Sequence, residues 1–416
     1  MMDSASTKPD YTSRRQFLLA AGAAGIGAGM ARFNFRSPGN TIKVGILHSL
    51  SGTMAISEAP LRDAALLAME EVNRQGGLLG RQVEAVVEDA ASDPDRFQVL
   101  AEKLLAQDQV CSIFGCWTSI SRKKVLPVLQ QHDGLLWYPL QYEGNECSRN
   151  VIYTGSTPNQ QILPAVDWLH GRGSRRFYLL GSDYIYPRTA NRIVERHLEE
   201  IRGVVAGKEY VPLGEQDFQA TIKRIRAARP DVVFSTINGD SNRGFYKAFR
   251  KAGITAKDLP VMATTLAEAE VRRIGALLTE GHLSTWAYFQ SVDTLDNNAF
   301  VKKFKDRYGD RRVTDDPIEA AYFQVHIWAE AVRKAQSIDV DAVRETVLGI
   351  KYNAPEGPVR IDPQNRHTWK MFRIGEVGEN GQFNVLHSSG DPVDPAPWDQ
   401  TLNSGLACDW KTGHTR

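Results

Sequence analysis

The feature that most constrains this fold is a regular alternation of short apolar runs with longer amphipathic segments, starting at Thr41. Residues 42–47 have the pattern of a strand, and residues 57–74 place Leu61, Ala65 and Val72 at helical spacing. The same pair of patterns follows twice more, as strand 83–87 with helix 94–107 and strand 110–114 with helix 119–131, and a fourth strand covers 135–138. This order predicts a parallel sheet with helices on both faces.

The alternation begins again after Pro158, which predicts a second parallel sheet. Its expected elements are helix 160–170, strand 177–180, helix 189–201, strand 209–211, helix 218–228, strand 232–235 and helix 243–252. A strand over 283–289 and a long helix over 317–335 follow, and residues 355–385 have the turns and short runs of antiparallel strands. Gly155 and Pro158 mark residues 153–158 as a crossing between two lobes.

The N-terminal residues have the pattern of an export signal. Arg14 and Arg15 stand directly before the apolar run 17–30, which is rich in Ala and Gly and is followed by Ala31. This predicts a twin-arginine signal over residues 1–31 and an exported, periplasmic protein. A membrane anchor is the alternative, but the run is shorter than the roughly 20 residues of a spanning helix.

Charge and composition exclude other classes of protein. Hydrophobic residues make up 42% of the 416 and charged residues 24%, which are globular averages. The formal net charge is +1, and loss of residues 1–31 would leave zero, with no basic block elsewhere. A nucleic-acid partner is therefore not expected, because phosphate binding needs clustered cations.

Four cysteines stand at 111, 116, 147 and 408. Four cysteines allow three pairings, so the count alone fixes none, although an oxidising compartment permits disulfides. We expect Cys111 to be a buried free thiol, and the pair Cys116 with Cys147 is the first to examine. The spacings do not suggest a metal site, and we expect no cofactor.

Function in such a fold is expected in the loops that follow the strands. Four of these loops carry hydroxyls, amides and aromatic rings without Arg or Lys: 115–121, 138–143, 181–187 and 235–242. Their chemistry favours a small, flat, neutral ligand, since every donor and acceptor of a buried amide must be matched. Each loop taken alone also has an ordinary structural explanation, such as Ser119 as a helix N-cap. Asp316 before Pro317, with Glu319 three positions on, fits a capping box, while Asp315 is a weaker ligand candidate.

These segments resemble a known family. Residues 115–119, 138–144, 157–160, 181–184, 238–242 and 315–322 are together similar to the urea-binding receptors of urea ABC transporters, which belong with the receptors for branched-chain amino acids and short amides. The resemblance implies a type I periplasmic binding protein fold, with two doubly wound α/β lobes joined by three crossing segments. We divide the chain accordingly into lobe 1 (41–157 and 284–350), lobe 2 (158–283 and 351–400) and a tail (401–416).

The resemblance also implies a urea site between the lobes. We expect Thr118 and Ser119 to donate to the urea oxygen and Trp117, Tyr138 and Tyr184 to form walls. Tyr142, Asn238 and Asp240 would accept from its N–H groups, and Gln141 completes the expected site. The expected partners are urea, the permease subunits of an ABC transporter and, transiently, the twin-arginine export machinery.

Other functions stay open at this stage. A receptor for short amides such as acetamide or formamide, or for branched-chain amino acids, is the nearest alternative. An amide or urea hydrolase is less favoured, because the sequence offers no Cys with a nearby His and no metal-ligand cluster. We therefore expect a binding protein and not an enzyme.

Overall fold

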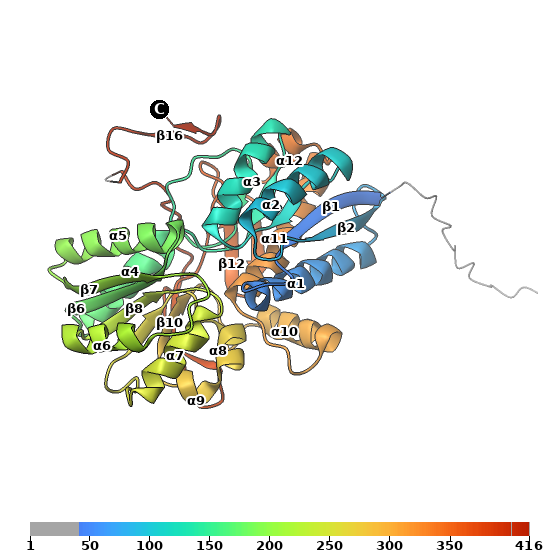
Figure 1. Ribbon diagram of the computed structural model, residues 1–416. Helices are drawn as coiled ribbons and strands as arrows, with labels where there is room; N and C mark the ends of the chain where they lie inside the picture. Colours follow the sequence, from blue (N-terminus) through green and yellow to red (C-terminus); the bar gives the residue numbers. More distant parts are fainter. Residues whose placement is uncertain (1–40, 401, 416) are drawn as a thin grey trace, which may run out of the picture. The chain divides into compact units, whose positions relative to one another are not determined.

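Two parallel sheets carry the alternation seen in the sequence (Figure 1). The structure is a computed structural model and describes residues 41–400 and 402–415. The twin-arginine signal expected over residues 1–31 lies outside these residues. None of the helices in the described part of the chain is both long and apolar enough to cross a membrane.

The first sheet has the order β2-β1-β3-β4-β5 and is parallel throughout. Its core includes Ile42, Val44 and Ile46 of β1, which are fully buried. The helices that share this core are amphipathic or apolar, as the sequence indicates. The elements are β1 (Thr41–His48), α1 (Ala55–Arg74), β2 (Gln82–Asp89), α2 (Pro94–Glu102), β3 (Ile113–Gly115), α3 (Ser119–Gln131), β4 (Leu136–Tyr138), β5 (Val151–Tyr153), α10 (Leu295–Tyr308), α11 (Asp316–Ala335) and α12 (Val340–Thr346).

The second sheet has the order β15-β14-β10-β9-β8-β6-β7 and is parallel except for β14, which runs antiparallel to both of its neighbours, β10 and β15. Alternate residues of β6 enter different cores: Phe177 and Leu179 pack with α4 and α5, while Tyr178 and Leu180 pack with α6 and α7. The elements are α4 (Ile162–Gly171), β6 (Arg176–Ser182), α5 (Ile185–Glu200), β7 (Val204–Val211), α6 (Gln219–Ala228), β8 (Val232–Thr236), α7 (Ser241–Lys251), β9 (Val261–Ala263), α8 (Glu268–Ile274), α9 (Ala276–Thr279), β10 (Leu283–Trp286), β14 (Arg373–Val377) and β15 (Phe383–Ser388). The two doubly wound sheets confirm the expected fold class.

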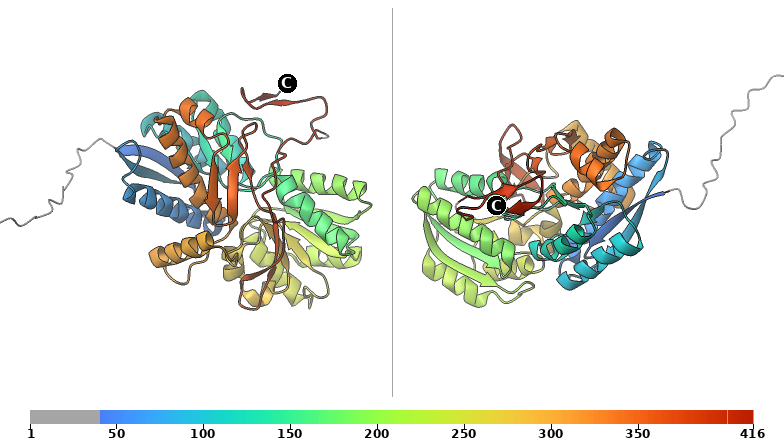
Figure 2. Two further views of the ribbon diagram at one scale, coloured as in Figure 1. Left: turned by 180° about the vertical axis from the view of Figure 1, so that it is seen from behind. Right: turned by 90° about the horizontal axis from the view of Figure 1, so that it is seen from above.

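A small antiparallel sheet follows α12, as expected from the turn-rich composition of this region. It consists of β11 (Lys351–Ala354), β12 (Gly357–Ile361) and β13 (Thr368–Trp369), and Figure 2 shows it beside the helices of the first lobe. Ala354, Val359 and Ile361 share the core of the first sheet. We keep the division into two lobes as a proposal, but assign residues 351–369 to lobe 1 because of this packing.

The lobes are joined by three segments, as the fold class requires. They connect β5 to α4 (154–161), β10 to α10 (287–294) and β13 to β14 (370–372). Gly155 allows the first to pass close to the loop after β4, because a Cβ there would lie 1.9 Å from the backbone of Leu140. Both lobes belong to one compact unit, Thr41–Arg416.

The second and third segments are held by charged side chains. Asp316 accepts from the backbone N–H of Ala287 (2.8 Å) and Tyr288 (3.0 Å), while Asp315 caps α11 by accepting from Ile318 N–H. The expectation that Asp316 is the N-cap of α11 is therefore wrong, because Asp315 holds that position. The carboxylate of Asp316 instead accepts hydrogen bonds from the backbone of the second crossing segment. Lys370 and Glu356 form a fully buried ion pair at 2.8 Å beside the third segment.

The disulfide also differs from expectation. Cys147 is bonded to Cys408, at a Cα–Cα distance of 5.5 Å, and Cys116 is a buried free thiol. The pairing of Cys116 with Cys147 is wrong because the C-terminal segment, with β16 (Cys408–Asp409) and β17 (His414–Thr415), returns to the loop after β4. There Pro397 O accepts from Asn145 N–H at 2.7 Å. Cys111 is a free thiol, as expected, but it is half-buried and not fully buried.

Candidate ligand-binding site

A small cavity lies where loops from the carboxyl ends of both parallel sheets meet. It is a tight cavity, with about 190 Å³ of space between atoms. Sites for drug-sized ligands are typically 300–1,000 Å³. The lining residues are Trp117, Ser119, Leu140, Gln141, Tyr184, Tyr186 and Asn238.

Five of the nine expected site residues line this cavity: Trp117, Ser119, Gln141, Tyr184 and Asn238. Leu140 and Tyr186 were not expected. Both stand within loops that the sequence pointed to, so the strand-end rule located the loops and not the individual side chains.

The other four expected residues do not line the cavity. Thr118 is the N-cap of α3 and accepts from Ser121 N–H, so Ser119 is not the cap. Tyr138 donates to Trp117 O at 2.5 Å, and Tyr142 bonds His367 Nε2 at 2.5 Å. Asp240 precedes α7 and pairs with Arg273 at 3.2 Å. These four side chains therefore bond other protein groups around the cavity and do not face a ligand in it.

Larger hollows exist in the described part of the chain, but they lie away from the strand ends. One between α6 and α7 contains about 950 Å³ of space between atoms and is lined by helix surface residues such as Lys223 and Lys247. We place the site in the smaller cavity, because it lies in the cleft between the strand ends where ligands bind in such sheets.

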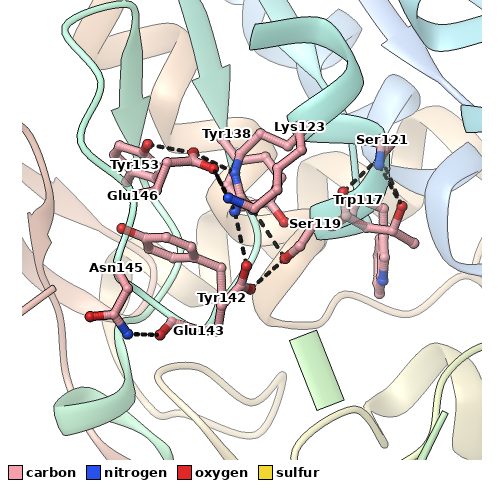
Figure 3. A network of polar contacts seen from close by, with 12 residues as sticks. Trp117, Ser119, Ser121, Lys123, Tyr138, Tyr142, Glu143, Asn145, Glu146 and Tyr153 are labelled. Carbon is pink, nitrogen blue, oxygen red and sulfur yellow. Dashed lines mark hydrogen bonds and ion pairs between the residues drawn. The ribbon is translucent and has the colours of Figure 1, made fainter. Parts of the chain in front are cut away.

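A buried charged network stands behind Ser119 (Figure 3). Arg122 is fully buried; its Nε donates to Glu146 at 2.8 Å and its Nη2 lies 3.4 Å from Glu143. Its guanidinium also lies 4.6 Å from the ring centres of Tyr138 and Tyr142. Arg122 directly follows the loop 115–121 and was not among the expected site residues, although its guanidinium contacts Ser119 of the cavity.

The network is balanced in charge. Burial alone would raise the pKa of Glu146, but the charges of Arg122 and Lys123 and the hydrogen bonds from Arg122 and Tyr153 outweigh it and hold the pKa at about 2. Two cations, Arg122 and Lys123, thus face two carboxylates, Glu143 and Glu146. The guanidinium is engaged by these acids and leaves no free charge for a ligand.

The hydrogens of three cavity groups point at protein acceptors. Gln141 Nε2 donates to Thr264 O at 3.1 Å, across the cleft, and Asn238 Nδ2 donates to Thr236 O at 3.3 Å. Ser119 Oγ donates to Glu143 at 2.5 Å. A backbone carbonyl and a carboxylate can only accept, so each contact fixes the orientation of its partner.

These orientations leave oxygen lone pairs for a ligand. Gln141 Oε1 is buried and has no hydrogen-bond partner. Such an unpaired buried acceptor costs about 1–3 kcal/mol. An N–H or O–H group of a ligand could satisfy it, and the first backbone N–H groups of α3 can donate to a ligand carbonyl.

The thiol of Cys116, the residue before Trp117, is not set up as a nucleophile. Burial raises the pKa of the Cys116 thiol, which keeps it protonated and a poor nucleophile. In the described residues there is no group of three or more His, Cys, Asp or Glu side chains arranged to hold a metal.

Two lobes that enclose a small cavity at their strand ends define a ligand-binding protein of the periplasmic type. A model of the periplasmic binding protein domain matches residues 42–404, and the chain belongs to this family. It is 24% identical over 368 residues to "Leu/Ile/Val-binding protein homolog 6" of Brucella melitensis, which covers 85% of this chain and 93% of the relative.

Solved structures share the fold. The solute-binding protein of an ABC transporter from Rhodopseudomonas palustris BisB5, in complex with 3,4-dihydroxybenzoic acid, has a TM-score of 0.79 at 22% identity and covers 85% of this chain and 98% of its own. The branched-chain amino acid binding protein LivJ of Streptococcus pneumoniae, in complex with isoleucine, has a TM-score of 0.75 at 18% identity, with 85% and 100% coverage. These matches agree with the expected fold.

Proposed function

We propose that this protein is the exported receptor of an ABC transporter and that it captures urea between its lobes for delivery to the permease. The family supports the receptor role. The choice of urea rests on one observation: a very small cavity whose side chains present oxygen lone pairs, one of them the unpaired Gln141 Oε1. Urea is flat, neutral and rich in N–H donors.

The contacts across the cleft support capture by closure. Gln141 of lobe 1 bonds Thr264 O of lobe 2, and Ser57 Oγ of α1 donates to Glu270 of α8 at 2.7 Å. A ligand drives closure only if it binds the closed form better than the open one. A ligand held by Ser119 on one side and Asn238 on the other meets this condition.

The two structural neighbours hold larger ligands, an aromatic acid and an amino acid, which are the rival candidates. Either is larger than urea and would need the cavity to widen further, and its carboxylate would find Arg122 already engaged by Glu143 and Glu146. The present geometry therefore favours urea over both.

Isothermal titration calorimetry of the purified protein with urea, acetamide, leucine and 4-hydroxybenzoate tests the proposal. We expect urea to bind most tightly and acetamide more weakly. Binding of leucine or 4-hydroxybenzoate without urea would overturn the choice of ligand, and ammonia release from urea would overturn the receptor role.

A further inference from the structure

Ser119 differs from the other cavity residues in that its hydroxyl group bonds to both members of an ion pair, Arg122 and Glu143. Its Oγ donates to Glu143 Oε2 at 2.5 Å and accepts from Arg122 Nη1 at 3.2 Å. A hydroxyl has one hydrogen and two lone pairs. With the hydrogen on Glu143 and one lone pair on Arg122, the group has a single lone pair left for the cavity.

Glu143 is itself fixed in place. It is 3% exposed, and its other oxygen, Oε1, lies 3.4 Å from Arg122 Nη2. Arg122 in turn is held by Glu146, which also accepts from the hydroxyl of Tyr153 at 2.7 Å. The hydroxyl of Ser119 therefore cannot turn toward a ligand without breaking a contact to a buried carboxylate.

We propose that Glu143, which does not line the cavity, is a specificity-determining positioning residue: it makes Ser119 an acceptor and so selects ligands with N–H groups on that side. This inference rests on the proposed function and deepens it. It also replaces the expectation that Ser119 donates to the urea oxygen.

The consequence is a preference between two similar ligands. Acetamide has a methyl group where urea has a second amino group, so it cannot satisfy as many acceptors. A site that leaves a buried acceptor unpaired loses about 1–3 kcal/mol, which corresponds to about 5- to 150-fold in affinity. We expect urea to bind more tightly than acetamide by a factor in this range.

The variant Glu143→Gln tests the proposal, because its amide can accept from Arg122 through Oε1 and donate to Ser119 through Nε2. The serine hydrogen is then free to turn into the cavity. We expect the ratio of urea to acetamide affinity to fall by about tenfold. Glu146→Gln is the matched control: it also removes a carboxylate from Arg122 but does not touch Ser119, so its ratio should stay at the wild-type value.

Ser119→Ala gives an independent test should Glu143→Gln not fold. If Ser119 accepts from an N–H group that only urea has, the variant weakens urea and leaves acetamide nearly unchanged. If Ser119 donates to the carbonyl that both ligands share, both weaken equally and the ratio is constant, which overturns the proposal. Absence of urea binding by the wild-type protein would instead overturn the proposed function itself, so the two failures are distinguishable.

Discussion

The two walls of the cavity are built by different means. On the side of lobe 1, Ser119 is backed by the charged network of Arg122, Glu143 and Glu146. On the side of lobe 2, Asn238 and Tyr186 are held by neutral groups, Thr236 O and Thr264 Oγ1. Ser119 is thus fixed before the lobes close, because all of these partners belong to lobe 1, while the side chains of the second wall rely on neutral hydrogen bonds.

Removal of the cation from the first wall should have the largest effect. Arg122→Met leaves Glu143 and Glu146 buried without their central partner, and loss of one member of a buried pair costs about 3–5 kcal/mol. We expect the free energy of unfolding to fall by this amount in thermal unfolding followed by circular dichroism. A decrease below about 1 kcal/mol would show that the network does not fix this wall.

The sequence predicted the architecture well, because hydrophobic periodicity reports burial directly. Helix α3 was expected over 119–131 and has those bounds. Parallel pairing also brings strand ends to one edge, so the loops of the site followed from the order of elements.

The roles of single residues were less predictable, since they depend on contacts distant in the chain. Arg122 meets carboxylates more than 20 residues away, and Cys147 meets Cys408 across 261 residues. Neighbouring residues with identical side chains, such as Asp315 and Asp316, take different roles because the helix begins between them. No periodicity in the sequence distinguishes them.

The free energy of unfolding should also depend on pH through His367. Its Nε2 bonds the hydroxyl of Tyr142, whose ring packs against Arg122 behind the first wall. Burial lowers the pKa of His367 from 6.5 to about 3. Between pH 7 and 5 the unfolded chain therefore takes up a proton that the folded chain does not, so stability is lost as the pH falls through 6.5. The loss from this group should reach about 2 kcal/mol at pH 5.

Thermal unfolding of the wild type and of His367→Gln at pH 7 and pH 5 measures this effect. Buried acids with raised pKa values, such as Glu268, act in the opposite direction. The informative quantity is therefore the difference between the two proteins, in which these acids cancel. An equal change in both would contradict the assignment to His367.

A substitution in the second wall should change the free energy of unfolding least. Tyr186→Phe removes the hydroxyl that donates to Thr264 Oγ1 at 3.0 Å but keeps the ring that lines the cavity. A neutral hydrogen bond contributes about 0.5–1.5 kcal/mol, so the free energy of unfolding should fall by about 1 kcal/mol. The same thermal unfolding measurement applies, with Tyr246→Phe, which removes a buried hydroxyl without a hydrogen-bond partner, as the control. A loss as large as that of Arg122→Met would mean that the second, neutral wall is as strongly fixed as the first, charged one.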